Sequence, residues 1–184
     1  MTFEITPVRT SRTPTLVLAF LYLLFIACLA LTAGNLPERV ATHFDLNGQP
    51  NGWMSRSTHL AFIGGIGLVL PLIVTGVCFA LRFAPDTSIN IPNREFWLAP
   101  ERRKETISFV FQHSLWLACG TVAFVTGVHL LIVQANRQIP VQLPIAPILA
   151  WAGCLIVGVT VWAVLMVRYF RSPVDPTVLP SQKA

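Results

Sequence analysis

The stretch Thr15–Thr32, TLVLAFLYLLFIACLALT, has 18 consecutive residues without a charge. A helix needs about 20 mainly apolar residues to cross the hydrocarbon core of a bilayer. Three further runs are equally free of charge: Leu60–Leu81, Ile107–Val133 and Ile145–Val167. The chain as a whole is 54% hydrophobic and 11% charged, with a mean hydropathy of +0.64. The sequence therefore predicts an all-α integral membrane protein, a four-transmembrane-helix bundle that interacts with the lipid bilayer.

We expect residues 1–184 to form a single polytopic membrane domain. Two polar segments separate the predicted spans, an outer loop at 34–59 and an inner loop at 82–106. Arg9 and Arg12 precede the first span, as basic residues precede a signal peptide. The apolar stretch is longer than most signal peptides, so we predict a retained span, with cleavage as the alternative.

The basic residues predict the orientation. Cytoplasmic segments of membrane proteins carry more Lys and Arg than the opposite side. Ten basic residues lie in the two tails and the inner loop: Arg9, Arg12, Arg82, Arg94, Arg102, Arg103, Lys104, Arg168, Arg171 and Lys183. The other side holds three: Arg39, Arg56 and Arg137. Both termini are therefore predicted to be cytoplasmic, and the net charge of +5 calls for no nucleic-acid partner.

The outer loop contains LPERVATHFDLNGQPNGW, residues 36–53. Apolar and polar positions alternate as in a strand, with Val40, Thr42, Phe44 and Leu46 facing one way and Ala41, His43, Asp45 and Asn47 the other. Asn47-Gly48 predicts a turn, and Asn51-Gly52 predicts a second one. We expect a short, ordered, hairpin-like extracytoplasmic loop that ends in an interfacial Trp53.

Polar side chains in this loop are the first candidates for a binding surface. The expected contact residues are His43, Asp45, Asn47, Asn51 and Trp53. His43 and Asp45, two residues apart in a strand, share a face and would suit a metal ion. His59 is the only further His or Cys on that side, so we expect a polar cluster that orders the loop, with no metal and no cofactor.

The inner loop contains IPNREFWLAPERR, residues 91–103. Pro100 followed by Glu101 predicts the start of a helix that reaches about Gln134. Phe96 and Trp97 are expected at the lipid interface. We expect the segment Phe96–Lys104 to be a docking site for a partner protein.

Two ladders of small residues predict helix packing. They are Cys119, Ala123 and Gly127 in the third span and Ala150, Cys154 and Gly158 in the fourth. Small residues every fourth position let helices approach closely in lipid. We expect these spans to pack as an antiparallel pair, with a homodimer through the same faces as the alternative. Pro71 is expected to kink the second span, and His113 and His129 to point to nearly opposite sides of the third.

The two loop motifs together resemble a bacterial membrane-domain family of unknown function, which also forms the N-terminal part of SdpI-like toxin-immunity proteins. The resemblance rests on Leu36, Pro37, His43, Phe44, Gly48, Gly52 and Trp53 outside, and on Pro92, Asn93, Trp97, Pro100, Glu101 and Arg102 inside. It implies a small helical membrane bundle and recognition of a toxin or partner at these positions. The four predicted spans are fewer than those of the full immunity proteins.

No nucleophile motif or phosphate-binding loop occurs, so we expect no enzyme. The prediction is a multi-pass protein of the bacterial inner membrane, immunity-like or signalling-like, that recognises an envelope peptide or membrane protein. The alternative is a small transporter or channel component that uses Pro71, Gln112 and His113. A polar cavity that reaches the midplane would favour transport, whereas an unbroken apolar bundle would favour recognition.

Overall fold

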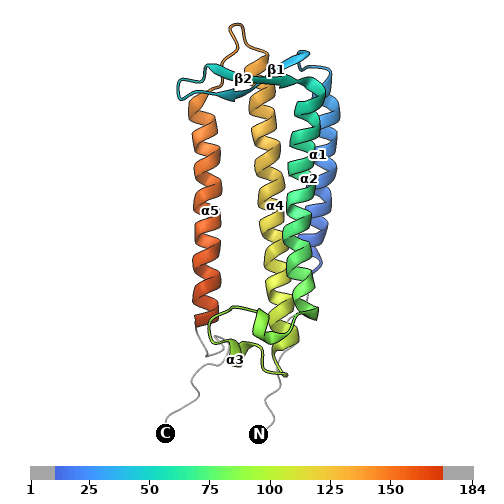
Figure 1. The fold of residues 1–184 in the computed structure, drawn as a ribbon, viewed down its shortest axis with the longest axis vertical. Coiled ribbons are helices and arrows are strands. Elements are labelled where there is room, and N and C mark those ends of the chain that lie inside the picture. The colour runs from blue at the N-terminus through green and yellow to red at the C-terminus, as the bar shows by residue number, and fades with distance from the viewer. Residues whose placement is uncertain (1–10, 172–184) are drawn as a thin grey trace.

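The computed structural model describes residues 11–171 as four long helices with a polar segment at each end (Figure 1). The helices are α1 (Thr13–Ala33), α2 (Arg56–Ala80), α4 (Arg103–Asn136) and α5 (Ile145–Arg171). All four are long and apolar enough to cross a membrane, so the chain is a multi-pass membrane protein. The described part is mostly helical, as expected.

Each end of the bundle is covered by one of the two loops. Strands β1 (Arg39–Phe44) and β2 (Pro50–Ser55) form a hairpin at one end, called here the hairpin end. At the other end, called the α3 end, the chain passes through η1 (Leu81–Phe83), η2 (Asp86–Ser88) and the short helix α3 (Arg94–Trp97). Helix α1 begins and α5 ends at the α3 end (Figure 1).

Helices α1, α2 and α4 make up the tightly packed part of the bundle. Their shared core includes Phe25, Ile63 and Val122, of which Phe25 and Val122 are fully buried. Gly67 lies against the Phe25 ring so closely that any Cβ at that position would overlap it. Close approach of helices at small residues is how membrane helices gain packing energy.

Helix α4 begins three residues later than predicted. Pro100 lies in a turn, in which the backbone N–H groups of Arg102 and Arg103 both donate to the Ala99 carbonyl. The last turn extends to Asn136 rather than Gln134, and the Asn136 side chain contacts the hairpin described below. Pro71 lies inside α2 without ending it, as expected for a membrane helix.

Helix α5 stands apart from the other three and packs on α4 less extensively than α1 or α2 does (Figure 1). At the hairpin end the Trp151 indole packs on Gly127 and donates to the Phe124 carbonyl at 3.0 Å. At the α3 end Tyr169 stacks on Phe109 with ring centroids 4.2 Å apart.

The expected ladder packing of α4 against α5 is therefore wrong in part. Cys119 faces α1 instead, with its Sγ 3.7 Å from the Pro14 carbonyl oxygen. Ala150 is exposed, and a Cβ at Gly158 would meet no atom within 4 Å. Ala123 and Cys154 line the space between α4 and α5 without closing it, since the bulky Trp151 holds the two helices apart.

The hairpin is antiparallel, with Val40 opposite Met54 and Ala41 opposite Trp53. Its register shifts on either side of His43, which is the mark of a bulge. The predicted alternation fails there, because Val40 and Ala41 are both 0% exposed, and Leu46, predicted on the same face as Val40, is 94% exposed. The predicted second turn at Asn51-Gly52 is also wrong, since both residues lie within β2.

Candidate functional site

The turn of the hairpin is organised by Asp45. Its Oδ1 accepts hydrogen bonds from the backbone N–H groups of Asn47 at 2.8 Å and Gln49 at 2.9 Å. Gly48 follows in the left-handed conformation with φ of 79°, which glycine adopts without strain. Asp45, one of the predicted contact residues, thus orders the turn, as expected for a polar cluster in this loop.

The side of the hairpin that faces away from the bundle carries the other predicted contact residues. His43 lies opposite Gly52, where a Cβ would come within 2.9 Å of the His43 ring and its Cβ. Glycine at 52 therefore allows the imidazole to lie across β2 while the side chain stays exposed. Trp53 is 42% exposed, and the Arg39 guanidinium lies 5.9 Å from its ring centroid. Asn47 and Asn51 are exposed, and Phe44 is half-buried.

The opposite side of the hairpin is held firmly on the bundle. Asn136, in the last turn of α4, pairs with Ala41 as a neighbouring strand would. Its Oδ1 accepts from the Ala41 N–H and its Nδ2 donates to the Ala41 carbonyl, both at 2.9 Å. Val40 and Leu36 pack with Ile132 and Val133 beneath. The hairpin is consequently a fixed cap on the bundle.

The hairpin turn also reaches the start of α5. The backbone N–H of Leu143 donates to the Gly48 carbonyl at 2.9 Å. A Cβ at Gly48 would overlap the Leu143 carbonyl oxygen, so only glycine fits between the turn and this segment. The hairpin therefore links the α5 end of the molecule to the α1, α2 and α4 core.

The α3 end holds α5 in a comparable way. Trp97 Nε1 donates to the Phe170 carbonyl at 2.9 Å, and Asn93 Nδ2 donates to the carbonyls of Phe170 and Arg171 at 3.0 Å. These are carbonyls of the last helical turn, which have no partner within their own helix. The Trp97 ring also stacks on Tyr169, with centroids 4.9 Å apart. Asn93 and Trp97, both predicted partner-binding residues, thus contact the end of α5.

Some of the remaining residues of the inner loop contact other parts of the protein, and others are exposed. Arg103 pairs with Asp86 at 2.8 Å and donates to the Ala84 carbonyl at 2.6 Å. Arg102 lies over the Phe96 ring, 4.0 Å from its centroid. Within the predicted docking segment, Pro100, Glu101 and Lys104 are exposed, whereas Trp97 and Leu98 are buried.

Sequence reasoning missed a chain of polar side chains inside the bundle. Thr32 Oγ1 lies 2.7 Å from His129 Nε2, and His129 Nδ1 lies 3.2 Å from His59 Nε2. The two imidazoles stack with centroids 5.4 Å apart, and their side chains are 0% (His129) and 2% (His59) exposed. The chain joins α1, α2 and α4 just below the hairpin. The sequence carried a signal, since Thr32 and His129 lie in the outer third of their predicted spans and His59 directly precedes the second span.

The hydrogen-bond directions in this chain follow from the hydroxyl. Thr32 Oγ1 has one proton and donates it to the Cys28 carbonyl at 2.7 Å. With its proton on this carbonyl, Thr32 Oγ1 accepts from His129 Nε2–H, which leaves His129 Nδ1 to accept from His59 Nε2–H. Across residues 11–171, no group of three His, Cys, Asp or Glu side chains is placed to hold a metal ion.

Residues 17–68, from α1 through the hairpin into α2, match the model of a family described as Domain of unknown function (DUF1648). The match includes the first loop motif and excludes the second one at 92–102. No curated protein and no solved structure matches the chain.

Proposed function

We propose that this protein is a non-enzymatic recognition protein of a bacterial cytoplasmic membrane, which binds a peptide or membrane-protein partner on the exposed side of the hairpin. The observation that carries the proposal is the contrast between the two sides of the hairpin. Val40 and the Asn136 bonds explain why one side is held on α4. His43, Asn51 and Trp53 on the other side are exposed, so burial in the bundle does not account for them.

The chemistry of the exposed side suits a protein or peptide partner. Trp and Arg are the residues that most often dominate binding energy at protein interfaces. Trp53 and Arg39 lie side by side here, and Leu46 projects from the turn with 94% of its surface exposed. Because the hairpin is already fixed on the bundle, binding requires little ordering of this surface, which favours affinity.

The distribution of basic residues supports an outward-facing hairpin. Within residues 11–171 the hairpin end carries Arg39, Arg56 and Arg137, whereas the α3 end carries Arg12, Arg82, Arg94, Arg102, Arg103, Lys104, Arg168 and Arg171. Arg9 and Lys183 lie outside the described residues. In this orientation the hairpin faces the envelope, as an immunity-like or signalling-like role requires.

The orientation is tested by labelling single cysteines in intact cells with a membrane-impermeant maleimide. The native cysteines Cys28, Cys78, Cys119 and Cys154 lie within helices and are first replaced by Ser or Ala. We expect labelling at Asn51→Cys and none at Thr87→Cys until the cells are opened. Labelling at Thr87→Cys alone would reverse the orientation and refute an envelope-facing hairpin.

Recognition is tested by in-cell photo-crosslinking from position 51, followed by mass spectrometry. Position 51 is chosen over 45 because Asp45 is required for the turn. We expect one peptide or envelope protein to be captured from position 51 and not from Leu23, a lipid-exposed control in α1. A Trp53→Ala change should reduce capture about tenfold or more, as for an interface anchor. Capture of lipid alone, from both positions, would refute the proposal.

The second candidate function is a small transporter or channel component. The Thr32–His129–His59 chain favours it, because polar side chains inside a membrane commonly mark an ion or proton path. Further along α4, the hydroxyls of Thr126 and Thr121 bond within the helix rather than with the polar chain. They donate to the carbonyls of Val122 and Leu117 at 2.7 and 3.0 Å. Proton flux into protein-containing liposomes, lost in His129→Phe, would support transport. Absence of flux would leave recognition as the better assignment.

A further inference from the structure

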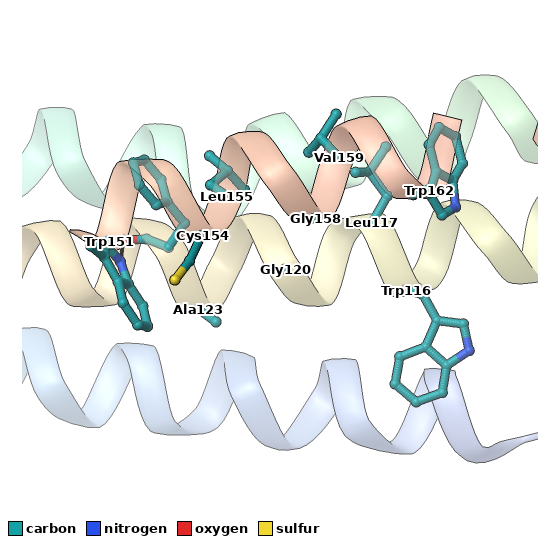
Figure 2. Close-up of a pocket in the computed structure, with 11 residues that line it drawn as sticks. Trp116, Leu117, Gly120, Ala123, Trp151, Cys154, Leu155, Gly158, Val159 and Trp162 are labelled. Carbon is teal, nitrogen blue, oxygen red and sulfur yellow. Dashed lines mark hydrogen bonds between the residues drawn. The ribbon is translucent and has the colours of Figure 1, made fainter. Parts of the chain in front are cut away.

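The space between α4 and α5 is an apolar groove with a volume of about 330 Å³ (Figure 2). Trp116, Gly120 and Ala123 line it from α4, and Trp151, Gly158 and Trp162 line it from α5. It extends about 16 Å along α5, from Trp151 to Trp162, at a rise of about 1.5 Å per residue. This volume lies within the range of small-molecule sites, about 300–1,000 Å³.

The glycines of the groove do not serve contact between the helices. A Cβ placed at Gly120 or at Gly158 would meet no atom within 4 Å. The helices are instead held apart by Trp151 on Gly127 at one end and by Tyr169 on Phe109 at the other. The two loops fix this spacing, since each of them contacts an end of α5. The groove is therefore a built feature of the fold, with small residues that keep its middle open.

One polar atom in the groove is left without a partner. Trp162 Nε1 is buried and donates to no acceptor among the described residues. Figure 2 shows this indole at one end of the groove, with its nitrogen on the side nearer α4. By contrast, Trp151 Nε1 at the other end donates to the Phe124 carbonyl. An N–H without an acceptor is unfavourable in a hydrocarbon environment, so an occupant that accepts a hydrogen bond there is favoured.

Two other occupants fit these observations poorly. A water molecule needs two to four polar partners, and the groove offers one donor in otherwise apolar walls. A helix of about 10 Å diameter would need a groove that continues along its axis, whereas this one is bounded by Trp151 on Gly127 at one end and by Tyr169 on Phe109 at the other.

We propose that the α4–α5 groove binds an uncharged, lipid-soluble molecule with a carbonyl oxygen that accepts the hydrogen bond of Trp162 Nε1. The molecule enters sideways from the bilayer, because the ends are closed by aromatic side chains. The lining residues carry no charge, which excludes ionised ligands. This site is independent of the hairpin surface and of the function proposed for it.

Benzophenone is a suitable probe, because it is an uncharged aromatic ketone that inserts into nearby C–H bonds on irradiation. The protein is reconstituted in phospholipid bilayers, irradiated with benzophenone, and digested for mass spectrometry. We expect labelled peptides from the groove faces of α4 and α5 in excess over lipid-exposed α1. Gly158→Leu, which fills the groove, should reduce their labelling to the level of α1.

A matched control lies on the same helix. A Cβ at Gly153 also meets no atom within 4 Å, but Gly153 does not line the groove, so Gly153→Leu should label like the wild type. Gly120→Leu fills the groove from the opposite wall and replaces Gly158→Leu if that variant does not fold. Trp162→Phe, which removes the donor, should reduce labelling about three- to tenfold, as for loss of one hydrogen bond.

The results separate the parts of the proposal. Equal labelling in wild type, Gly158→Leu and Gly120→Leu would overturn the site. Loss of labelling in the groove-filling variants with no change in Trp162→Phe would overturn the carbonyl contact, because the groove would then hold only hydrocarbon such as a lipid chain.

Discussion

At the scale of single residues, the buried chain of Thr32, His129 and His59 shows how polar groups are accommodated in this bundle. The two rings bond to one another and His129 bonds to Thr32, whose hydroxyl donates to the Cys28 carbonyl. Within lipid a polar group that loses its partner is costly. The stability of the hairpin end should therefore depend on these side chains.

Thr32→Val tests this dependence, because valine keeps the shape of threonine and removes the acceptor for His129 Nε2–H. We expect the free energy of unfolding in detergent micelles to fall by about 1–3 kcal/mol, the cost of an unsatisfied buried donor. Thr126→Val is the control, since the Thr126 hydroxyl bonds only within α4. If both variants lose the same stability, the contact with His129 contributes nothing of its own.

Gly48 is the second residue whose identity is dictated by local geometry. Gly48→Ala places a side chain at a φ of 79° and against the Leu143 carbonyl. We expect a loss of at least about 1–2 kcal/mol in unfolding free energy, since a left-handed conformation alone costs about that much. Gly65→Ala in α2, where a Cβ meets no atom within 4 Å, should be neutral or slightly stabilising. Thermal unfolding of Gly48→Ala and Gly65→Ala, measured side by side, tests this difference in stability. Equal stability of the two variants would contradict the prediction.

At the scale of elements, the sequence predicted the kinds of structure better than their contacts. The apolar runs predicted all four membrane helices, and the alternation before Asn47-Gly48 predicted β1 and its turn. The bulge around His43 was not predictable, because it lies next to Ala41, whose backbone N–H and carbonyl bond with Asn136, a residue 95 positions away. Asn51-Gly52 has the composition of a turn, yet Gly52 is needed in β2 to accommodate the His43 ring.

The attachment of the hairpin to α4 is testable through Asn136. Asn136→Ala removes both bonds to Ala41 and should increase amide exchange at Ala41 about tenfold or more, since loss of a buried hydrogen bond costs about 1–3 kcal/mol. Gln134→Ala, an exposed position in the same turn of α4, should leave exchange at Ala41 unchanged. Hydrogen exchange measured by mass spectrometry on the peptide that spans β1 provides the comparison. Unchanged exchange in Asn136→Ala would show that apolar packing alone holds the hairpin.

At the scale of the whole molecule, the two loop motifs share a structural task. The hairpin reaches α5 through Gly48 and Leu143, and the α3 segment reaches it through Asn93 and Trp97. Sequence reasoning identified both loops as working surfaces but could not show that they contact the same helix, since these bonds join residues 73 to 95 positions apart in the chain. The α4–α5 groove was unforeseen for the same reason, because small residues predict close packing unless a bulky neighbour such as Trp151 intervenes.

This arrangement predicts that α5 can be loosened without unfolding the core. Asn93→Ala combined with Trp97→Phe removes the side-chain donors to the last turn of α5, while the packing of α1, α2 and α4 stays intact. We expect amide exchange in the last turn, up to Arg171, to rise at least about tenfold, because two or more hydrogen bonds are lost at about 0.5–1.5 kcal/mol each. Arg94→Ala, at an exposed position of α3, is the matched control. Exchange at the hairpin end of α4, near Ile132, should not change in either variant. If it rises together with that of α5, the four helices unfold as one unit, and α5 is not a separately held element.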